Sequence, residues 1–124
     1  FGLSYTRFAY SSLKLSHTRI SDKDSFTASI ELTNVGDREG TEVVQLYIRD
    51  IYSSATRPVK ELKDFARVTL KPGEKKTVTF TVTPDKLAYW NRNMQYGVEK
   101  GEFEIMIGSS SQDKDLKKVK MEVL

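Results

Sequence analysis

The stretch that decides the fold is TVTFTVT, residues 77–83, in which every second residue is a threonine. Between the threonines stand Val78, Phe80 and Val82, which are all apolar. β-Branched and aromatic residues are enriched in strands. Alternation with a period of two gives a strand one apolar and one polar face. This stretch therefore predicts a half-buried β-strand.

The same period recurs in both directions from this stretch. Residues 26–32 place Phe, Ala, Ile and Leu alternately with polar residues, which again predicts a strand with one buried face. Residues 43–48 carry apolar groups at both even and odd positions, so we expect both faces of that strand to be partly covered. Further strands are predicted at residues 8–15, 103–107 and 119–123.

Residues 59–70, VKELKDFARVTL, are compatible with two structures. Val59, Leu62 and Phe65 would line one face of a helix. However, Pro58 precedes the segment, residues 71–74 (KPGE) close it as a turn, and its last residues alternate with period two. We interpret this segment as an extended strand.

Two further signals place corners between strands. Thr83 followed by Pro84 is typical of a helix start, but the pattern lasts only one turn. Residues 88–98 have aromatic residues on either side of the polar tripeptide NRN, which suggests a hairpin. Residues 34–40 form a loop rich in residues that tolerate positive φ. The whole pattern gives seven to eight short strands and predicts an all-β antiparallel sandwich of the immunoglobulin or fibronectin type III kind.

Composition excludes several classes of function. The 124 residues suffice for one domain, and their charged residues make up 30% with a net charge of only +3. A nucleic-acid binder normally shows a clustered basic stripe, whereas here only residues 114–120 (KDLKKVK) are locally basic, and we interpret them as a solvated strand face. No apolar run approaches the roughly 18 residues that span a bilayer, and no signal segment is visible. We expect neither a nucleic-acid nor a membrane partner.

Glu102 and Glu104 form the pair of carboxylates that most resembles a catalytic one. They stand two residues apart on one predicted strand, so about 6.6–7 Å separates them along the backbone. That distance is near the separation of glycosidase carboxylates, roughly 5–9.5 Å. A general acid also needs burial or a like charge to raise its pKa, and both residues lie opposite the apolar face. We expect them to be exposed to solvent and not catalytic.

The remaining chemistry-bearing residues give no site. The Asp22/Asp24 and Asp113/Asp115 pairs lack the spacing of a calcium loop, and we expect them at charged loop tips. His17 is the only histidine, and the chain has no cysteine and no glycine-rich phosphate loop. We therefore expect no metal, no cofactor and no catalysis within this chain.

Aromatic residues leave binding open. Tyr52 lies beside Arg57 in a predicted loop, and Trp90 and Tyr96 flank the predicted hairpin. Such rings stack on sugars in carbohydrate-binding modules, but rings at a sheet corner more often cover the core, which we prefer for Trp90. Tyr52, Arg57, Trp90 and Tyr96 are thus candidate contacts to a glycan or to another domain.

Five motifs in order carry a family resemblance: FGLSYT, TN-GD--G-EVVQLY, RP-KELK-F, LKPGE and GEFEIM-G-SS. They resemble the C-terminal fibronectin type III-like domain of family 3 glycoside hydrolases, which are β-glucosidases, β-xylosidases and relatives. Ile51 stands where the family often has Pro, and Asp64 where it usually has Gly. The resemblance extends from Phe1 to about Ser111.

The resemblance implies a parent enzyme that retains anomeric configuration. Its Asp nucleophile would lie in a barrel domain and its Glu acid/base in an α/β domain, both before Phe1, so no carboxylate here inherits either role. Residues 1–7 would be the junction with those catalytic domains and residues 8–124 the domain itself. Phe1, Leu3 and Tyr5 are then candidates for the inter-domain seam. Many relatives are exported, which implies a periplasmic or extracellular parent.

Three functions follow from these considerations. The chain is a non-catalytic accessory domain that supports the catalytic domains of its parent, or it tethers the enzyme to polymeric glycan, or it forms a homodimer interface through residues 59–65 or the loop before them. The expected partner is accordingly the catalytic part of the same polypeptide, a glycan or a second copy.

Overall fold

The structure is a computed structural model that describes residues 7–50, 60–90, 96–98, 101–112 and 115–124. Within these ranges the chain forms short strands and a single helical turn. In chain order the elements are β1 (Phe8–Leu15), β2 (Arg19–Ile20), β3 (Phe26–Asn34), β4 (Gly40–Asp50), β5 (Glu61–Leu70), β6 (Lys75–Val82), α1 (Pro84–Leu87), β7 (Tyr89–Trp90), β8 (Tyr96–Gly97), β9 (Gly101–Gly108) and β10 (Leu116–Val123).

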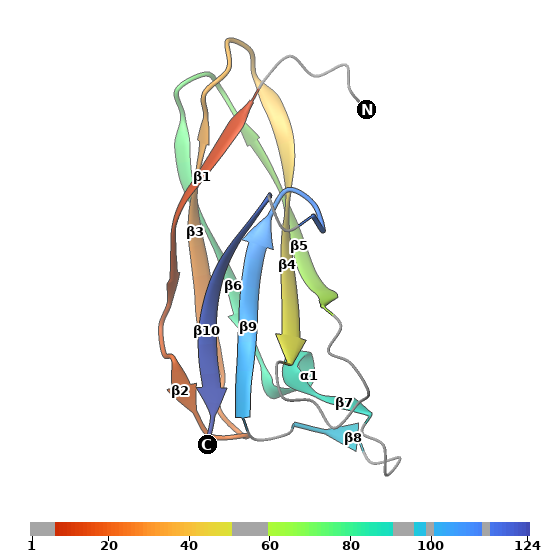
Figure 1. Ribbon diagram of the computed structural model, residues 1–124. Helices are drawn as coiled ribbons and strands as arrows, with labels where there is room; N and C mark the ends of the chain where they lie inside the picture. The colour runs from red at the N-terminus through yellow and green to blue at the C-terminus, as the bar shows by residue number, and fades with distance from the viewer. Residues whose placement is uncertain (1–6, 51–59, 91–95, 99–100, 113–114) are drawn as a thin grey trace.

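Two sheets face each other and form the sandwich (Figure 1). One sheet has three strands in the order β1-β3-β6, and the other has five in the order β2-β10-β9-β4-β5. Of the described pairings, only that of β2 with β10 is parallel. The short pair β7–β8 lies beside α1 at one end of the sandwich (Figure 1). The predicted antiparallel sandwich of seven to eight strands is confirmed.

The core consists of the alternating residues that the sequence marked as apolar. In β6, Val78, Phe80 and Val82 are buried while the threonines between them are exposed. In β3, Ile30 and Leu32 are fully buried against them. Burial of each such aliphatic side chain stabilises the fold by about 1.5–3 kcal/mol relative to exposure. The second sheet contributes Val44, Leu46, Ile48, Phe103, Ile105, Ile107, Met121 and Val123 to the same core.

Residues 61–70 form the extended strand β5, which confirms the extended interpretation over the helical one. The structure also explains the helix-like spacing of this segment. Leu46 pairs with Asp64 but Tyr47 pairs with Leu62, so Lys63 is an extra residue in a β-bulge. The bulge places Leu62 and Phe65 on the same side of the sheet although they are three residues apart.

Turns and caps follow local chemistry. Gly73 adopts a φ of 80°, which glycine accommodates without strain, and Glu74 N donates to Lys71 O across 2.9 Å to close the KPGE turn. Thr83 occupies the N-cap of α1 with Pro84 in the first turn, as predicted, although its side chain makes no cap hydrogen bond. The predicted hairpin of residues 88–98 is present as β7 paired with β8.

The loop after β3 uses Asn34 in a way that its turn propensity does not predict. Asn34 is the last residue of β3 and is completely buried. Its side-chain nitrogen donates to Leu70 O at 2.9 Å and to Arg38 O at 2.8 Å, and its side-chain oxygen accepts from Gly36 N at 2.9 Å. The side chain, not a positive φ, therefore organises this loop.

Candidate functional site

The structure describes only some of the residues that the sequence predicts as contacts to a glycan or to another domain. Tyr52 and Arg57, and the seam residues Phe1, Leu3 and Tyr5, lie outside the described residues. Trp90 and Tyr96 are opposite each other in the β7–β8 pair, so the hairpin brings these two positions together.

The expectation that both carboxylates on β9 are exposed is wrong for Glu104. Glu104 is only 8% exposed, and an oxygen of its carboxylate is 2.5 Å from Nη2 of Arg49, its cross-strand partner on β4. Burial occurs because Tyr47 and Met106, at the next positions along the same face, form an apolar cluster with Leu116. The cluster assembles from three strands, so no single strand predicts it.

We use the term outer face for the side of the five-stranded sheet that points away from the core. Its residues include Gln45, Tyr47 and Arg49 on β4, Leu62 and Phe65 on β5, Glu102, Glu104 and Met106 on β9, and Leu116, Lys118 and Lys120 on β10. Met106 at its centre is 1% exposed, whereas Leu62 and Phe65 at its margin are 50% and 57% exposed. The expectation that both faces of residues 43–48 are partly covered is confirmed by Tyr47, which is 9% exposed.

Polar groups on the outer face are mostly paired. The hydroxyl of Tyr47 donates to Gln45 Oε1 at 2.6 Å, and Gln45 Nε2 donates to Ser109 O at 3.0 Å. Arg49 is the exception, because its Nε is buried and has no acceptor among the described residues. Buried polar groups are nearly always hydrogen-bonded in proteins, so this unmatched donor sets Arg49 apart from the paired groups around it.

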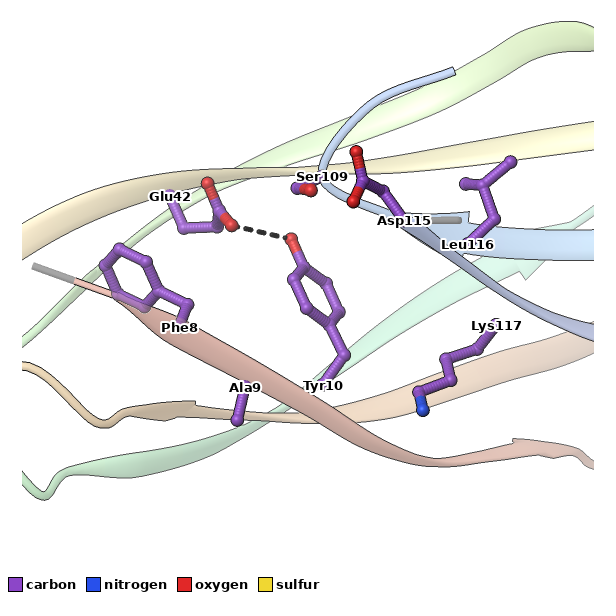
Figure 2. Close-up of a pocket in the computed structure, with 8 residues that line it drawn as sticks. All are labelled: Phe8, Ala9, Tyr10, Glu42, Ser109, Asp115, Leu116 and Lys117. Carbon is purple, nitrogen blue, oxygen red and sulfur yellow. Dashed lines mark hydrogen bonds between the residues drawn. The ribbon is translucent and has the colours of Figure 1, made fainter. Parts of the chain in front are cut away.

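A cavity of about 350 Å³ opens at the other end of β4 (Figure 2). β4 pairs with β9 only from Gln45 onward, so its first residues pair with β5 alone, and β1 crosses beside them. The cavity lies between β1, the start of β4 and the β9–β10 turn. Its lining comprises Phe8, Ala9, Tyr10, Glu42, Ser109, Asp115, Leu116 and Lys117.

Tyr10 and Glu42 meet in this cavity, where the phenol donates a 3.0 Å hydrogen bond to the carboxylate (Figure 2). Burial raises the pKa of Glu42, and the hydrogen bond from Tyr10 only partly offsets this. Burial, followed by the charge of Glu42, raises the pKa of Tyr10 far above its usual value. The phenol is therefore a permanent donor, and the pair links the two sheets. Sequence reasoning missed both residues, since no local pattern distinguishes them.

The described residues bring no three or more His, Cys, Asp or Glu side chains together as a metal site. Asp24 instead accepts a hydrogen bond from Ser21 N at 3.0 Å within an exposed turn. As predicted, His17 is on the surface, and Lys117, Lys118 and Lys120 are on exposed parts of β10. The one helix that the structure describes is too short to cross a bilayer.

Comparison with known proteins places the chain in a family. A model of the fibronectin type III-like domain matches residues 42–111. The chain is 47% identical over 111 residues to the periplasmic β-glucosidase of Salmonella typhimurium, and the matched region covers 90% of this chain and 14% of that protein. It is 49% identical over 123 residues to a β-xylosidase of Formosa agariphila, covering 99% of this chain and 17% of that protein.

Solved structures agree. The β-glucosidase of Listeria innocua in complex with glucose is 35% identical, with a TM-score of 0.86, over 99% of this chain and 17% of that one. A β-glucosidase of Erythrobacter marinus is 39% identical, with a TM-score of 0.90, over 100% of this chain and 16% of that one. This chain thus spans 14–17% of the length of these relatives. It belongs to the fibronectin type III-like domain family, and its relatives are the domains of that family carried by family 3 glycoside hydrolases.

Proposed function

We propose that this chain is a non-catalytic accessory domain that structurally supports the catalytic part of a retaining β-glucosidase- or β-xylosidase-type glycoside hydrolase. The proposal rests on how small a part of each related enzyme this chain matches. They cover 90–99% of this chain but only 14–17% of the two enzymes. We infer that the catalytic residues of such an enzyme lie in the remainder.

The packing of the described carboxylates supports a structural role. Glu104 is engaged by Arg49 within the outer face, and Glu42 is engaged by Tyr10 between the sheets. Each is held by a partner of its own sheet or across the sandwich.

Deletion from the complete polypeptide tests this function. The enzyme that lacks residues 1–124 should have a lower Tm and a lower soluble yield than the intact enzyme. The isolated chain should not hydrolyse aryl β-glucosides or aryl β-xylosides. If the truncated enzyme melts and turns over as the intact one does, the accessory role is wrong.

Glycan binding is a second candidate, favoured by one observation. The β7–β8 pair places Trp90 directly opposite Tyr96, so two aromatic positions share one small hairpin. Affinity electrophoresis on soluble glucans and xylans, with Trp90→Ala as comparison, tests this candidate. Retardation that Trp90→Ala abolishes would support it, and free migration on every polymer would exclude it.

The site of action of the parent is also a proposal. One relative is named a periplasmic β-glucosidase, and we propose a periplasmic or extracellular parent on that basis. Cell fractionation of the native host with an antibody against this domain would test it, and a purely cytoplasmic signal would contradict it.

A further inference from the structure

Exposed apolar side chains are concentrated at one place on this domain. Among the described residues, the large hydrophobic ones that are exposed are Val35, Leu62, Phe65 and Leu124. Val35 is in the loop after β3, and Leu124 is the last residue. Single exposed apolar residues of this kind are normal. Leu62 and Phe65 differ because they lie on the same side of one edge strand.

These two residues adjoin an apolar cluster of buried residues. The bulge at Lys63 sets Leu62 opposite Tyr47, and Tyr47 is in turn opposite Met106. Apolar side chains therefore continue from β5 across β4 to β9, which are adjacent strands in Figure 1, and of these Leu62 and Phe65 at the β5 edge are exposed. Exposed apolar side chains that gather in this way mark interaction sites on soluble proteins.

Arg49 adds a polar requirement to the same surface. It lies two residues after Tyr47 on the outer face, one of its terminal nitrogens is used by Glu104, and its buried Nε has no acceptor among the described residues. The side chain of Arg49 is still 37% exposed, so its guanidinium can donate to a carbonyl or carboxylate oxygen of a partner that packs on the outer face. The surface thus calls for an apolar partner that carries one hydrogen-bond acceptor.

The length of the relatives indicates which partner this is. At least 83% of each of the two curated enzymes lies outside the region that matches this chain, since the match covers 14% and 17% of them. Domains of one polypeptide commonly share interfaces of about 600–1,500 Å². We propose that the outer face is the docking surface for the catalytic part of the same polypeptide, with Leu62 and Phe65 as apolar anchors and Arg49 as the donor. This inference rests on the proposed accessory function and adds the face through which it acts.

Thiol labelling of the complete polypeptide tests the docking face. The 124 residues contain no cysteine, so Phe65→Cys or Leu62→Cys introduces one thiol into this domain, and thiols elsewhere are counted with the unsubstituted protein. Val35→Cys is the matched control, because Val35 is 53% exposed and Phe65 57%. On a docked outer face, the Phe65→Cys and Leu62→Cys thiols should react with a maleimide at least about tenfold more slowly than the Val35→Cys thiol, because reaction then requires opening of the interface. In denaturant all three should react alike.

The outcomes separate this inference from the accessory function. Equal labelling of all three thiols, with a Tm that still falls on deletion of the domain, would show that docking uses another face. Equal labelling with no effect of deletion would overturn both proposals. Slow labelling that becomes fast on dilution, with a dimer by light scattering, would assign the outer face to a second copy and would also overturn the inference.

Discussion

The phenol of Tyr10 on β1 donates to Oε2 of Glu42 on β4 across 3.0 Å, and so connects the two sheets where β9 no longer accompanies β4. The two residues are 32 positions apart in the sequence. Asp115, in the turn before β10, and Lys117 on β10 line the same cavity. The carboxyl of Glu42 is therefore half-buried beside a phenol that stays protonated, which makes this contact sensitive to pH.

We expect Glu42 to reduce stability as the pH rises. Burial raises its folded-state pKa above the usual 4.5, so the folded protein binds the proton more tightly than the unfolded chain does. The contribution of this carboxyl is therefore most favourable at pH values below 4.5 and becomes less favourable as the pH rises through the folded pKa. Glu42→Gln keeps an acceptor for the phenol and removes the charge. Its free energy of unfolding relative to wild type should increase between about pH 4 and pH 7, as measured by urea denaturation.

The control for this series is Glu39→Gln, which changes an exposed carboxylate in the neighbouring loop. A constant difference between Glu42→Gln and wild type across the pH range would contradict the prediction. Tyr10→Phe should cost roughly 1–2 kcal/mol, because it removes a hydrogen bond to a charged acceptor. It should also steepen the pH dependence, since the bond from Tyr10 is the larger of the two hydrogen bonds that lower the pKa of Glu42.

The fold was predictable because its main determinant is local. Alternation in residues 77–83 reports directly which side chains are buried, and β1 extends over the predicted residues 8–15. The ambiguity of residues 59–70 has a physical cause as well. The bulge at Lys63 shifts the period of the strand by one residue, which imitates the spacing of a helix. Such a bulge depends on the pairing with β4 and is not encoded in β5 alone.

The sites were less predictable because they depend on contacts between distant strands. Glu104 alternates with core residues, so its local pattern predicts exposure, but Arg49 on β4 and the cluster of Tyr47, Met106 and Leu116 from three strands bury it. Asn34 has the propensity of a turn residue, yet its bond to Leu70 O joins positions 36 residues apart. Neither contact can be derived before the sheet order is known.

Asn34→Ala should destabilise the domain by roughly 2–3 kcal/mol. It leaves the buried carbonyl of Leu70 without the donor that Asn34 supplies. It also removes the hydrogen bonds that the Asn34 side chain donates to Arg38 O and accepts from Gly36 N. Asn34→Asp has the same shape but, when ionised, cannot donate to either carbonyl. It should therefore be less stable at neutral than at acidic pH. Urea midpoints measure both effects, and Asp37→Ala on the exposed loop is the control. Similar midpoints for Asn34→Ala and Asp37→Ala would contradict the role of the side chain.

Arg49→Met should cost roughly 2–4 kcal/mol, because it leaves the buried carboxylate of Glu104 without its partner. The double variant Arg49→Met/Glu104→Met should recover much of this loss, since apolar groups fit the neighbouring cluster of Tyr47 and Met106. Chemical denaturation of the two single variants and the double variant gives the coupling energy. Additive losses would show that the ion pair contributes little to the outer face.

Gly108→Ala should destabilise the domain because the turn after β9 leaves no room for a side chain. A Cβ built on Gly108 would lie 1.9 Å from the backbone oxygen of Asp115 and 3.0 Å from Cδ2 of Leu116. The backbone of Asp115, just before β10, would have to move, at a cost of roughly 1–3 kcal/mol. Gly97→Ala is the matched control, because a Cβ at that position has nothing within 4 Å, and we expect a change within about 0.5 kcal/mol. Thermal and urea unfolding of the two variants measure the difference, and equal stability would mean that the β9–β10 connection adjusts freely around residue 108.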